Sequence, residues 1–271
     1  MAKPRSKIDI TCQNPGCSYF LKEEGKDIVK RGKNRAGHQQ YYCNHCQKWF
    51  VETANTSLYH KHLSEKEIET ICKHLVEKNG IRSIERLTGH HRDTIGRLLE
   101  DMAVHAERIN EYLIHQLGLT PIECDEIWSF VKKKQKNIKP SSKNRIEEGD
   151  QWTYTSIKRN TYFFISFAVG KWTQDTRMKM MNKLYERIQL PFPDNKIEIF
   201  TDENREYKEV ISALYAEPCM NYGQLIKIKE NGRLVDKEKR IIFGTPDLEE
   251  IETTQIENFN GIFQERNGRL V

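Results

Sequence analysis

Residues 122–131 (Ile-Glu-Cys-Asp-Glu-Ile-Trp-Ser-Phe-Val) constrain the fold most strongly, because they place three acidic side chains inside a run of strand-forming residues. β-Branched and aromatic residues dominate this run and Pro121 precedes it, so the pattern predicts a β-strand. A carboxylate buried in a strand costs free energy unless it is paired. The acids of this strand therefore indicate a specific use, of which metal binding is one.

Two later segments carry further acids in suitable places. Residues 197–202 form a short apolar run that ends on Asp202, and residues 252–266 predict a helix with Glu257 on its polar side. Two strands and a helix can bring three carboxylates together into the hard oxygen-ligand site that Mg²⁺ prefers. We therefore predict that Asp125, Asp202 and Glu257 hold two Mg²⁺ or Mn²⁺ ions.

The residue pattern alone leaves the choice among neighbouring acids open. Glu123 shares a strand face with Asp125 by the period of two, whereas Glu126 is expected to point to the other face. Glu203 directly follows Asp202. Without further information, Glu257 could also be an ordinary surface carboxylate.

Four cysteines near the N-terminus form two close pairs. Cys12 and Cys17 have four residues between them, twenty-five residues follow, and Cys43 and Cys46 enclose Asn44-His45. Four thiolates in two knuckles predict a tetrahedral structural Zn²⁺ site of the ribbon type. The alternative is four unrelated buried or free cysteines. The remaining cysteines are scattered, which favours a reducing cytosol over a disulfide framework.

The net charge of +5 is unevenly distributed, because residues 1–50 hold ten Lys/Arg against four Asp/Glu, a local charge of +6. This excess indicates a polyanion-binding module at the N-terminus. Its expected contact residues are basic side chains between the cysteine pairs, unless they form an ordinary solvated face: Lys26, Lys30, Arg31, Lys33 and Arg35.

Residues 64–117 predict three helices. Ser64-Glu65-Lys66-Glu67 is a capping box, and the helix that it opens ends at Asn79-Gly80. Residues 81–87 and a helix starting after Thr88-Gly89 follow, and we expect the last helix, or one after it, to continue to Leu117. Its apolar stripe is expected to pack in a core, with packing on the next domain or on a second subunit as the alternatives. Three helices with a glycine-bearing turn predict either a helix-turn-helix or a plain helical linker domain. A helix-turn-helix would direct Arg92, Thr94 and Arg97 toward DNA.

The C-terminal part of the sequence predicts three strands, a helix, a strand, a helix, a hairpin and a helix, in that order. The expected segments are 122–131, 151–157, 161–169, 174–189, 197–202, 205–214, the pair 224–229 and 239–243, and 252–266. Residues 132–150, which include Pro140-Ser141-Ser142, are expected to form an exposed loop. This order predicts an α+β chain whose mixed sheet is flanked by helices, a domain of the ribonuclease H kind.

Several motifs taken together resemble the insertion-sequence-1 family of transposases. They are Asp125-Glu126-Ile127-Trp128-Ser129-Phe130, Thr201-Asp202-Glu203-Asn204-x-x-Tyr207, Ile256-Glu257-x-x-Asn260-Gly261, and Gly37-His38-Gln39-x-Tyr41-x-Cys43. The resemblance covers nearly the whole chain, and the Asp-Glu-x-Trp-Ser block is its most specific part. It implies a zinc ribbon (1–60), a helix-turn-helix (61–117) and a ribonuclease H-like catalytic domain (118–271).

The resemblance also implies a function. The chain would be a DDE-type transposase of an insertion sequence, with Asp125, Asp202 and Glu257 as its metal-binding acids and its N-terminal modules on the terminal inverted repeats. Such an enzyme catalyses DNA transposition and recombination on double-stranded element ends and target, as a homodimer or larger assembly. We expect it in a prokaryotic cytoplasm, associated with the nucleoid, because no signal peptide or membrane-span pattern is present.

Three features depart from the family pattern. The first cysteine knuckle is longer than the common two-residue spacing, and the gap from Asp202 to Glu257 is long, which the 224–243 hairpin accounts for. The chain ends at Arg269-Leu270-Val271, where the family continues with a basic segment, so we expect a C-terminally truncated copy. An inactive DNA-binding regulator and a sequence-independent nuclease are the alternative functions.

Overall fold

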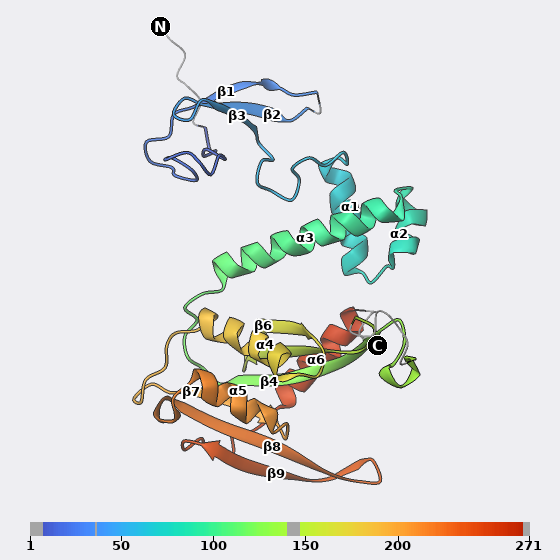
Figure 1. Ribbon diagram of the computed structural model, residues 1–271, viewed down its shortest axis with the longest axis vertical. Helices are drawn as coiled ribbons and strands as arrows, with labels where there is room; N and C mark the ends of the chain where they lie inside the picture. The colour runs from blue at the N-terminus through green and yellow to red at the C-terminus, as the bar shows by residue number, and fades with distance from the viewer. Residues whose placement is uncertain (1–7, 36, 140–146, 268–271) are drawn as a thin grey trace. The chain divides into compact units, whose positions relative to one another are not determined.

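The computed structural model describes residues 8–35, 37–139 and 147–267 (Figure 1). Residues 140–142 of the expected loop and the terminal Arg269-Leu270-Val271 lie outside the described residues. The chain divides into two compact units, Met1–Arg108 and Ile109–Val271, and each is described by itself.

A small antiparallel sheet opens the first unit. Its strands are β1 (Ile28–Lys33), β2 (Gln39–Cys43) and β3 (Lys48–Val51), in that spatial order. One face packs on a cluster that contains Cys12, Cys17 and Cys43, with Phe50 against it. The cysteines therefore occupy the position where a larger domain would have an apolar core.

Three helices follow, with bounds close to the predicted ones: α1 (Glu65–Val76), α2 (Ile81–Thr88) and α3 (Arg92–Leu113). The capping box is confirmed, because the Ser64 hydroxyl accepts from the Glu67 backbone and the Glu67 carboxylate accepts from the Ser64 backbone. Gly89 ends α2 with a φ of 76°, which favours glycine, and His90-His91 completes the turn to α3. Side chains from all three helices form one core: Ile68, Ile71, Ile84, Ile95 and Leu98.

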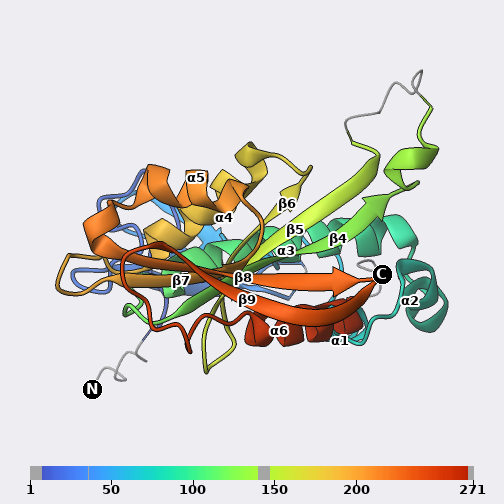
Figure 2. The ribbon, with the colours of Figure 1, turned by 90° about the horizontal axis from the view of Figure 1, so that it is seen from below.

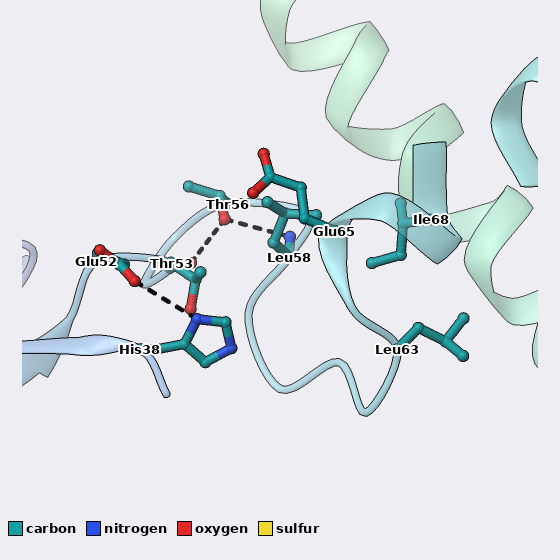
Figure 3. Close-up of a pocket in the computed structure, with 8 residues that line it drawn as sticks. All are labelled: His38, Glu52, Thr53, Thr56, Leu58, Leu63, Glu65 and Ile68. Atoms are coloured by element: carbon teal, nitrogen blue, oxygen red, sulfur yellow. Dashed lines mark hydrogen bonds and ion pairs between the residues drawn. The ribbon is translucent and has the colours of Figure 1, made fainter. Parts of the chain in front are cut away.

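The segment that joins β3 to α1 borders a shallow hollow (Figure 3). His38 Nδ1 lies 3.6 Å from Glu52 Oε1 on one side, and Leu63 and Ile68 form the other side. The Thr56 hydroxyl donates to the Thr53 carbonyl and fixes the turn between them. The lining mixes the contact between His38 and Glu52 with threonine and apolar side chains.

The end of α3 differs from the prediction. The helix stops at Leu113, and Leu117 lies instead in an extended bridge, where its N–H donates to the Arg187 carbonyl and its carbonyl accepts from Gln189. These two bonds hold Leu117 in a conformation that a helix cannot include. The expected core packing of the distal stripe is also wrong, because Ile109 is 43% exposed and Leu113 is 64% exposed.

A mixed six-stranded sheet dominates the second unit. In spatial order β6-β5-β4-β7-β8-β9, its strands are β4 (Ile122–Val131), β5 (Gly149–Lys158), β6 (Phe163–Gly170), β7 (Ile197–Asp202), β8 (Met220–Glu230) and β9 (Arg233–Phe243). β4, β5 and β6 form an antiparallel meander, β7 runs parallel to both β4 and β8, and β9 is antiparallel to β8. The predicted element order is confirmed, and the hairpin strands are longer than expected.

Helices cover both faces of this sheet (Figure 2). α4 (Gln174–Arg187) and α5 (Glu206–Leu214) lie on one face, and α6 (Thr254–Arg266) lies on the other. Two short 3-10 turns, Gln135–Asn137 and Glu217–Cys219, interrupt the connections. Within the described parts of the chain, none of the helices is long and apolar enough to cross a membrane.

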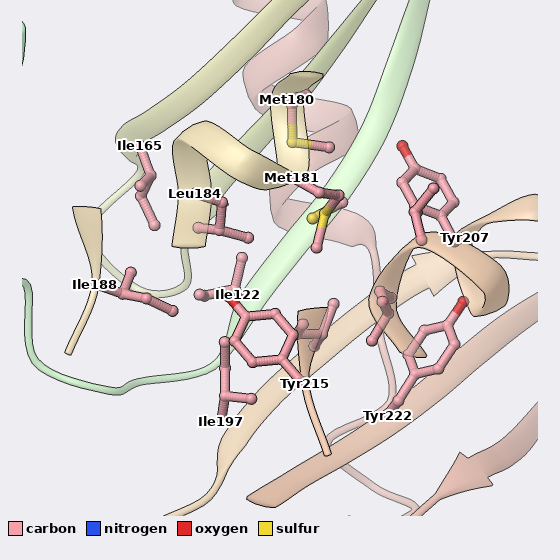
Figure 4. Packing of buried hydrophobic residues seen from close by; sticks show 14 of the residues in the cluster. Ile122, Ile165, Met180, Met181, Leu184, Ile188, Ile197, Tyr207, Tyr215 and Tyr222 are labelled. Atoms are coloured by element: carbon pink, nitrogen blue, oxygen red, sulfur yellow. The ribbon is translucent and has the colours of Figure 1, made fainter. Parts of the chain in front are cut away.

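The core between the sheet and the α4–α5 layer is fully buried (Figure 4). Ile122 of β4, Leu184 of α4 and Tyr207 of α5 meet there, and the fully buried Met180 and Met181 of α4 help to fill the core. This packing fixes β4 and β7 in the sheet, so the acids at their ends have defined positions.

Candidate metal centres

The register between β4 and β7 places Asp125 beside Asp202. The two parallel strands pair from Ile122 with Ile199 to Cys124 with Thr201, after which β7 ends at Asp202 while β4 continues. Asp125 is therefore the first residue of β4 beyond the paired stretch. In sheets with parallel strands, ligands bind at the carboxyl ends of strands, which is where this pair lies.

Glu126 joins the pair. One carboxylate oxygen from each of Asp125, Glu126 and Asp202 lies within 4.8 Å of the other two. Sequence reasoning set Glu126 aside, because alternation directs it to the opposite face from Asp125. Its carboxylate indeed turns toward α5, where it accepts from Asn204 Nδ2 at 2.8 Å and from the Tyr207 hydroxyl at 3.1 Å. Glu126, Asn204 and Tyr207 all belong to the motifs quoted above, and that was the signal that could have found them.

Asp125 is oriented from the other face. Asn260 of α6 donates from Nδ2 to Asp125 Oδ2 at 2.9 Å. The buried Thr155, which pairs with Asp125 across β4 and β5, in turn donates to Asn260 Oδ1 at 3.0 Å. The amide therefore cannot rotate freely, and the Asp125 carboxylate is held in one orientation.

Glu257 lies near this group but does not belong to it. It sits on the first turn of α6, where it accepts from the Thr253 hydroxyl at 2.7 Å and forms an ion pair with Lys227 of β8. Although burial opposes the change, Lys227 and Thr253 hold the pKa of Glu257 below its ordinary value. Burial raises the pKa of Asp202 and the Glu257 charge adds to that rise, so the two carboxylates lie within electrostatic reach.

Glu123 has a structural role. It is buried, and its carboxylate pairs with Arg159 Nε at 2.8 Å and accepts from the Ile256 backbone N–H at 2.8 Å. Arg159 also donates to the carbonyls of Glu250 and Glu252. This network anchors the start of α6 to β4 and so positions Asn260 and Glu257. The buried Glu123 carboxylate is therefore explained by its ion pair and needs no metal ion.

The three clustered acids resist ionisation together. Burial, reinforced by the charge of Asp202, raises the pKa of Asp125 to about 6. Burial and the charges of Asp202 and Asp125 raise the pKa of Glu126 to about 8. Like charges held close in a desolvated site disfavour each other's ionised form. A bound cation would remove this conflict.

The arrangement fits a divalent cation with hard oxygen ligands. Mg²⁺ binds oxygens at about 2.1 Å in an octahedron, so adjacent ligands stand about 3.0 Å apart and opposed ligands about 4.2 Å apart. The acid oxygens lie within 4.8 Å of one another, so side-chain movement would draw them together around an ion. Asp125, Glu126 and Asp202 could hold one ion directly, and Glu257 could contribute if it left Lys227.

Protons and divalent cations should compete for this group, which predicts a pH-dependent stability. Because the folded pKa values are raised, the unfolded chain releases these protons first as pH rises from about 4 to about 8, and stability falls across that window. Without divalent cations, the melting temperature should fall from about pH 5 to about pH 8. Mg²⁺ or Mn²⁺ should raise it more at the higher pH, where fewer protons must be displaced. Differential scanning fluorimetry measures both effects.

A double variant tests whether the effects of pH and Mn²⁺ on the melting temperature arise from Asp125 and Glu126. The double substitution Asp125→Asn, Glu126→Gln removes the charges with little change of shape, so its melting temperature should vary less with pH and respond less to Mn²⁺. An equal Mn²⁺ response in the double variant would place the binding site elsewhere.

The cysteines form a second candidate centre, in the first unit. Sulfur atoms of Cys12, Cys17, Cys43 and Cys46 all lie within 4.8 Å of one another. Cys12 Sγ is 3.7 Å from Cys46 Sγ, and Cys17 Sγ is 4.0 Å from Cys43 Sγ. A tetrahedron with Zn–S bonds of about 2.3 Å has edges of about 3.8 Å. These two separations match that edge and the others lie within 4.8 Å, so the four thiols fit a Zn²⁺ site, and all four cysteines are free.

Most of the residues that the sequence predicts to contact DNA are exposed to solvent. Arg92, Thr94 and Arg97 are exposed at the beginning of α3, directly after the turn that contains Gly89. Four of the five basic side chains of the ribbon are also exposed: Lys30, Arg31, Lys33 and Arg35. Lys26 instead pairs with Glu23 at 2.6 Å.

Local geometry and the residue motifs carry the argument for each of these sites, because no protein-family model matches the chain.

Proposed function

We propose that this protein is a DDE-type DNA transposase of an insertion sequence, acting on the terminal inverted repeats of its own element. The observation that carries the proposal is the convergence of Asp125, Glu126 and Asp202 at the carboxyl end of β7. Asp202 is distant in sequence from the adjacent residues Asp125 and Glu126, and Asp125 and Asp202 are acids that the family resemblance implies. A surface cluster of acids would not need Asn260, Asn204 and Tyr207 to orient it.

The fold supports the same proposal. The second unit follows the element order from which a domain of the ribonuclease H kind was predicted, with helices on both faces of a mixed sheet. In the first unit, the four-cysteine cluster supports a zinc ribbon, and the short turn from α2 to the exposed start of α3 supports a helix-turn-helix. Together they supply DNA-binding surfaces separate from the acids.

In this proposal, the acids would hold Mg²⁺ or Mn²⁺, and the ions would contact the phosphates of the DNA. Two divalent ions, when bound, supply an activated oxygen nucleophile and stabilise the leaving oxygen of a phosphodiester. Asp125 and Asp202 would hold the ions from the positions that the register of β4 and β7 gives them. Glu126 completes one side of the site, and Glu257 approaches from α6 on the other.

The overall reaction has two parts. Hydrolysis breaks a phosphodiester at the element end and leaves a 3′-hydroxyl, and that hydroxyl then attacks a target phosphodiester and displaces its 3′-oxygen. No cysteine, serine or tyrosine nucleophile is needed, so the protein's own residues position the strands and the ions.

A DNA-binding regulator derived from a transposase is the second candidate. The ion pair between Glu257 and Lys227 favours it, because Lys227 neutralises the acid that would complete the site. In a regulator this pair would be permanent, whereas in an active enzyme DNA and cations would have to displace Lys227 from Glu257.

A cleavage assay separates the two candidates. The full chain should cut DNA that carries the inverted repeats bracketing its gene, in Mg²⁺ or Mn²⁺ but not without them. Glu257→Gln should lower cutting by about 100-fold or more, as expected for loss of a metal-binding carboxylate. Glu265→Gln, an exposed acid on the same helix, is the matched control and should cut normally. Specific binding without any cutting would favour the regulator.

A further inference from the structure

The two faces of the β1-β2-β3 sheet have different surroundings. Cys43 and Phe50 belong to the face that packs on the cysteine cluster. The opposite face is defined by register, because Val29 pairs with Tyr42 and Tyr42 pairs with Trp49 across the three strands. Directly paired residues project to the same side of a sheet, so Tyr42 and Trp49 lie together on the face away from the cysteines.

This second face carries an unusual aromatic surface. Trp49 is 57% exposed, although tryptophan is a residue that is highly buried on average. The Tyr42 ring lies 5.5 Å from it, at an interplanar angle of 59°. The guanidinium carbon of Arg31 is 5.8 Å from both ring centroids, which brings a fixed positive charge to the pair.

We infer that this face binds unpaired bases of DNA, with Trp49 and Tyr42 as stacking surfaces and Arg31 as the group that contacts the adjoining phosphate. The inference rests on the proposed function to the extent that DNA is the ligand. It assigns to the ribbon a base-stacking site that the basic residues alone do not predict.

Charge selects a nucleic acid as the occupant. Residues 1–50 carry a local charge of +6, and the exposed Arg31 lies on the aromatic face itself. Proteins that bind single strands combine a positively charged track with aromatic side chains on which successive bases stack. A second copy of this chain docking through Trp49 would bring the same excess of positive charge and be repelled.

The aromatic rings select unpaired bases over a duplex. In double-stranded DNA, each base face is covered by the next base pair, so Trp49 could reach only edges and backbone. At a distorted or frayed element end, an unstacked base exposes a whole face. Stacking on one aromatic side chain accounts for about 5- to 150-fold in affinity.

The test is binding of a fluorescently labelled oligothymidylate to the full chain at low salt, without divalent cations, followed by anisotropy. Trp49→Ala should weaken binding by about tenfold or more, and Trp49→Phe should stay within about threefold of wild type because phenylalanine still stacks. Binding of a duplex of equal length should change much less. Tyr112→Ala, which removes an exposed aromatic side chain from α3, is the matched control and should bind normally.

A second measurement leaves the protein unchanged. Wild type should bind an oligonucleotide with abasic sites as weakly as Trp49→Ala binds the intact strand. Because this comparison uses the unaltered protein, it tests the stacking site even if Trp49→Ala disturbs the fold of the β1-β2-β3 sheet. Unchanged affinity of Trp49→Ala, an equal loss on duplex, or full affinity for abasic DNA would overturn the inference. So would a dimer of wild type that Trp49→Ala dissociates without loss of DNA binding. Because the assay needs neither cutting nor Mg²⁺, its result is independent of whether the chain is an active transposase.

Discussion

Asp125→Asn should abolish Mg²⁺-dependent cutting of terminal-repeat DNA, by about 1,000-fold or more, and leave DNA binding unchanged. Asparagine preserves the volume of the side chain and an oxygen that can still accept from Asn260. It removes the negative charge at the position where β4 passes beyond the end of β7. Asp202→Asn should have the same effect, because the two carboxylates act as a pair.

The same variant should become more stable in the absence of metal, and this separates a metal-binding role from a structural one. Burial and the Asp202 charge raise the pKa of Asp125 to about 6, so ionised Asp125 opposes folding at neutral pH. Removing that charge should raise the melting temperature measured without divalent cations. A structural acid such as Glu123, which is paired with Arg159, should instead destabilise the fold when it is neutralised.

Glu198→Gln provides the matched control for Asp125→Asn. Glu198 lies near the opposite end of β7 from Asp202, where it accepts from Asn221 at 3.2 Å. Its neutralisation should change neither cutting nor the response to Mg²⁺. Joint loss of cutting and binding in Asp125→Asn would contradict the catalytic role, since it would indicate a misfolded protein or an acid needed for DNA contact.

Local patterns predicted the strands that carry the site, for a physical reason. β4 and β7 have the predicted bounds, because proline or polar residues border short apolar runs that are buried on both sheet faces. The hairpin of β8 and β9 was predicted too short. Its outer half is charged and exposed, and backbone pairing rather than burial holds it together, so hydrophobic periodicity gives no signal there.

The composition of the acid group depended on long-range contacts that periodicity cannot reveal. Alternation correctly predicted that Glu126 and Asp125 point to different faces, yet these adjacent residues of β4 can still share a site because the neighbouring strand β7 ends beside them. The pairing of Glu257 with Lys227 joins residues thirty positions apart through α6 and β8. Only the folded chain places that lysine beside the acids.

Cys43→Ser should remove the bound zinc, unfold the β1-β2-β3 sheet and weaken DNA binding by about tenfold or more, as expected when a small metal-dependent domain loses a ligand. Cys43 is fully buried at the end of β2, and the cluster on which the sheet packs consists largely of the cysteines themselves. Serine is a poor ligand for zinc, and the remaining aromatic side chains are too few to hold three short strands. Elemental analysis of the purified protein measures the zinc content directly.

The second unit should be unaffected, because its buried core contains none of these residues. In Cys43→Ser, the Mn²⁺-induced rise in melting temperature at about pH 8 should therefore persist, which distinguishes local unfolding of the ribbon from general damage. Cys219→Ser, at a half-buried cysteine outside the cluster, should retain zinc and DNA binding. If Cys43→Ser kept a full equivalent of zinc, the proposed four-cysteine centre would be wrong. Interactions other than zinc binding would then have to stabilise the β1-β2-β3 sheet.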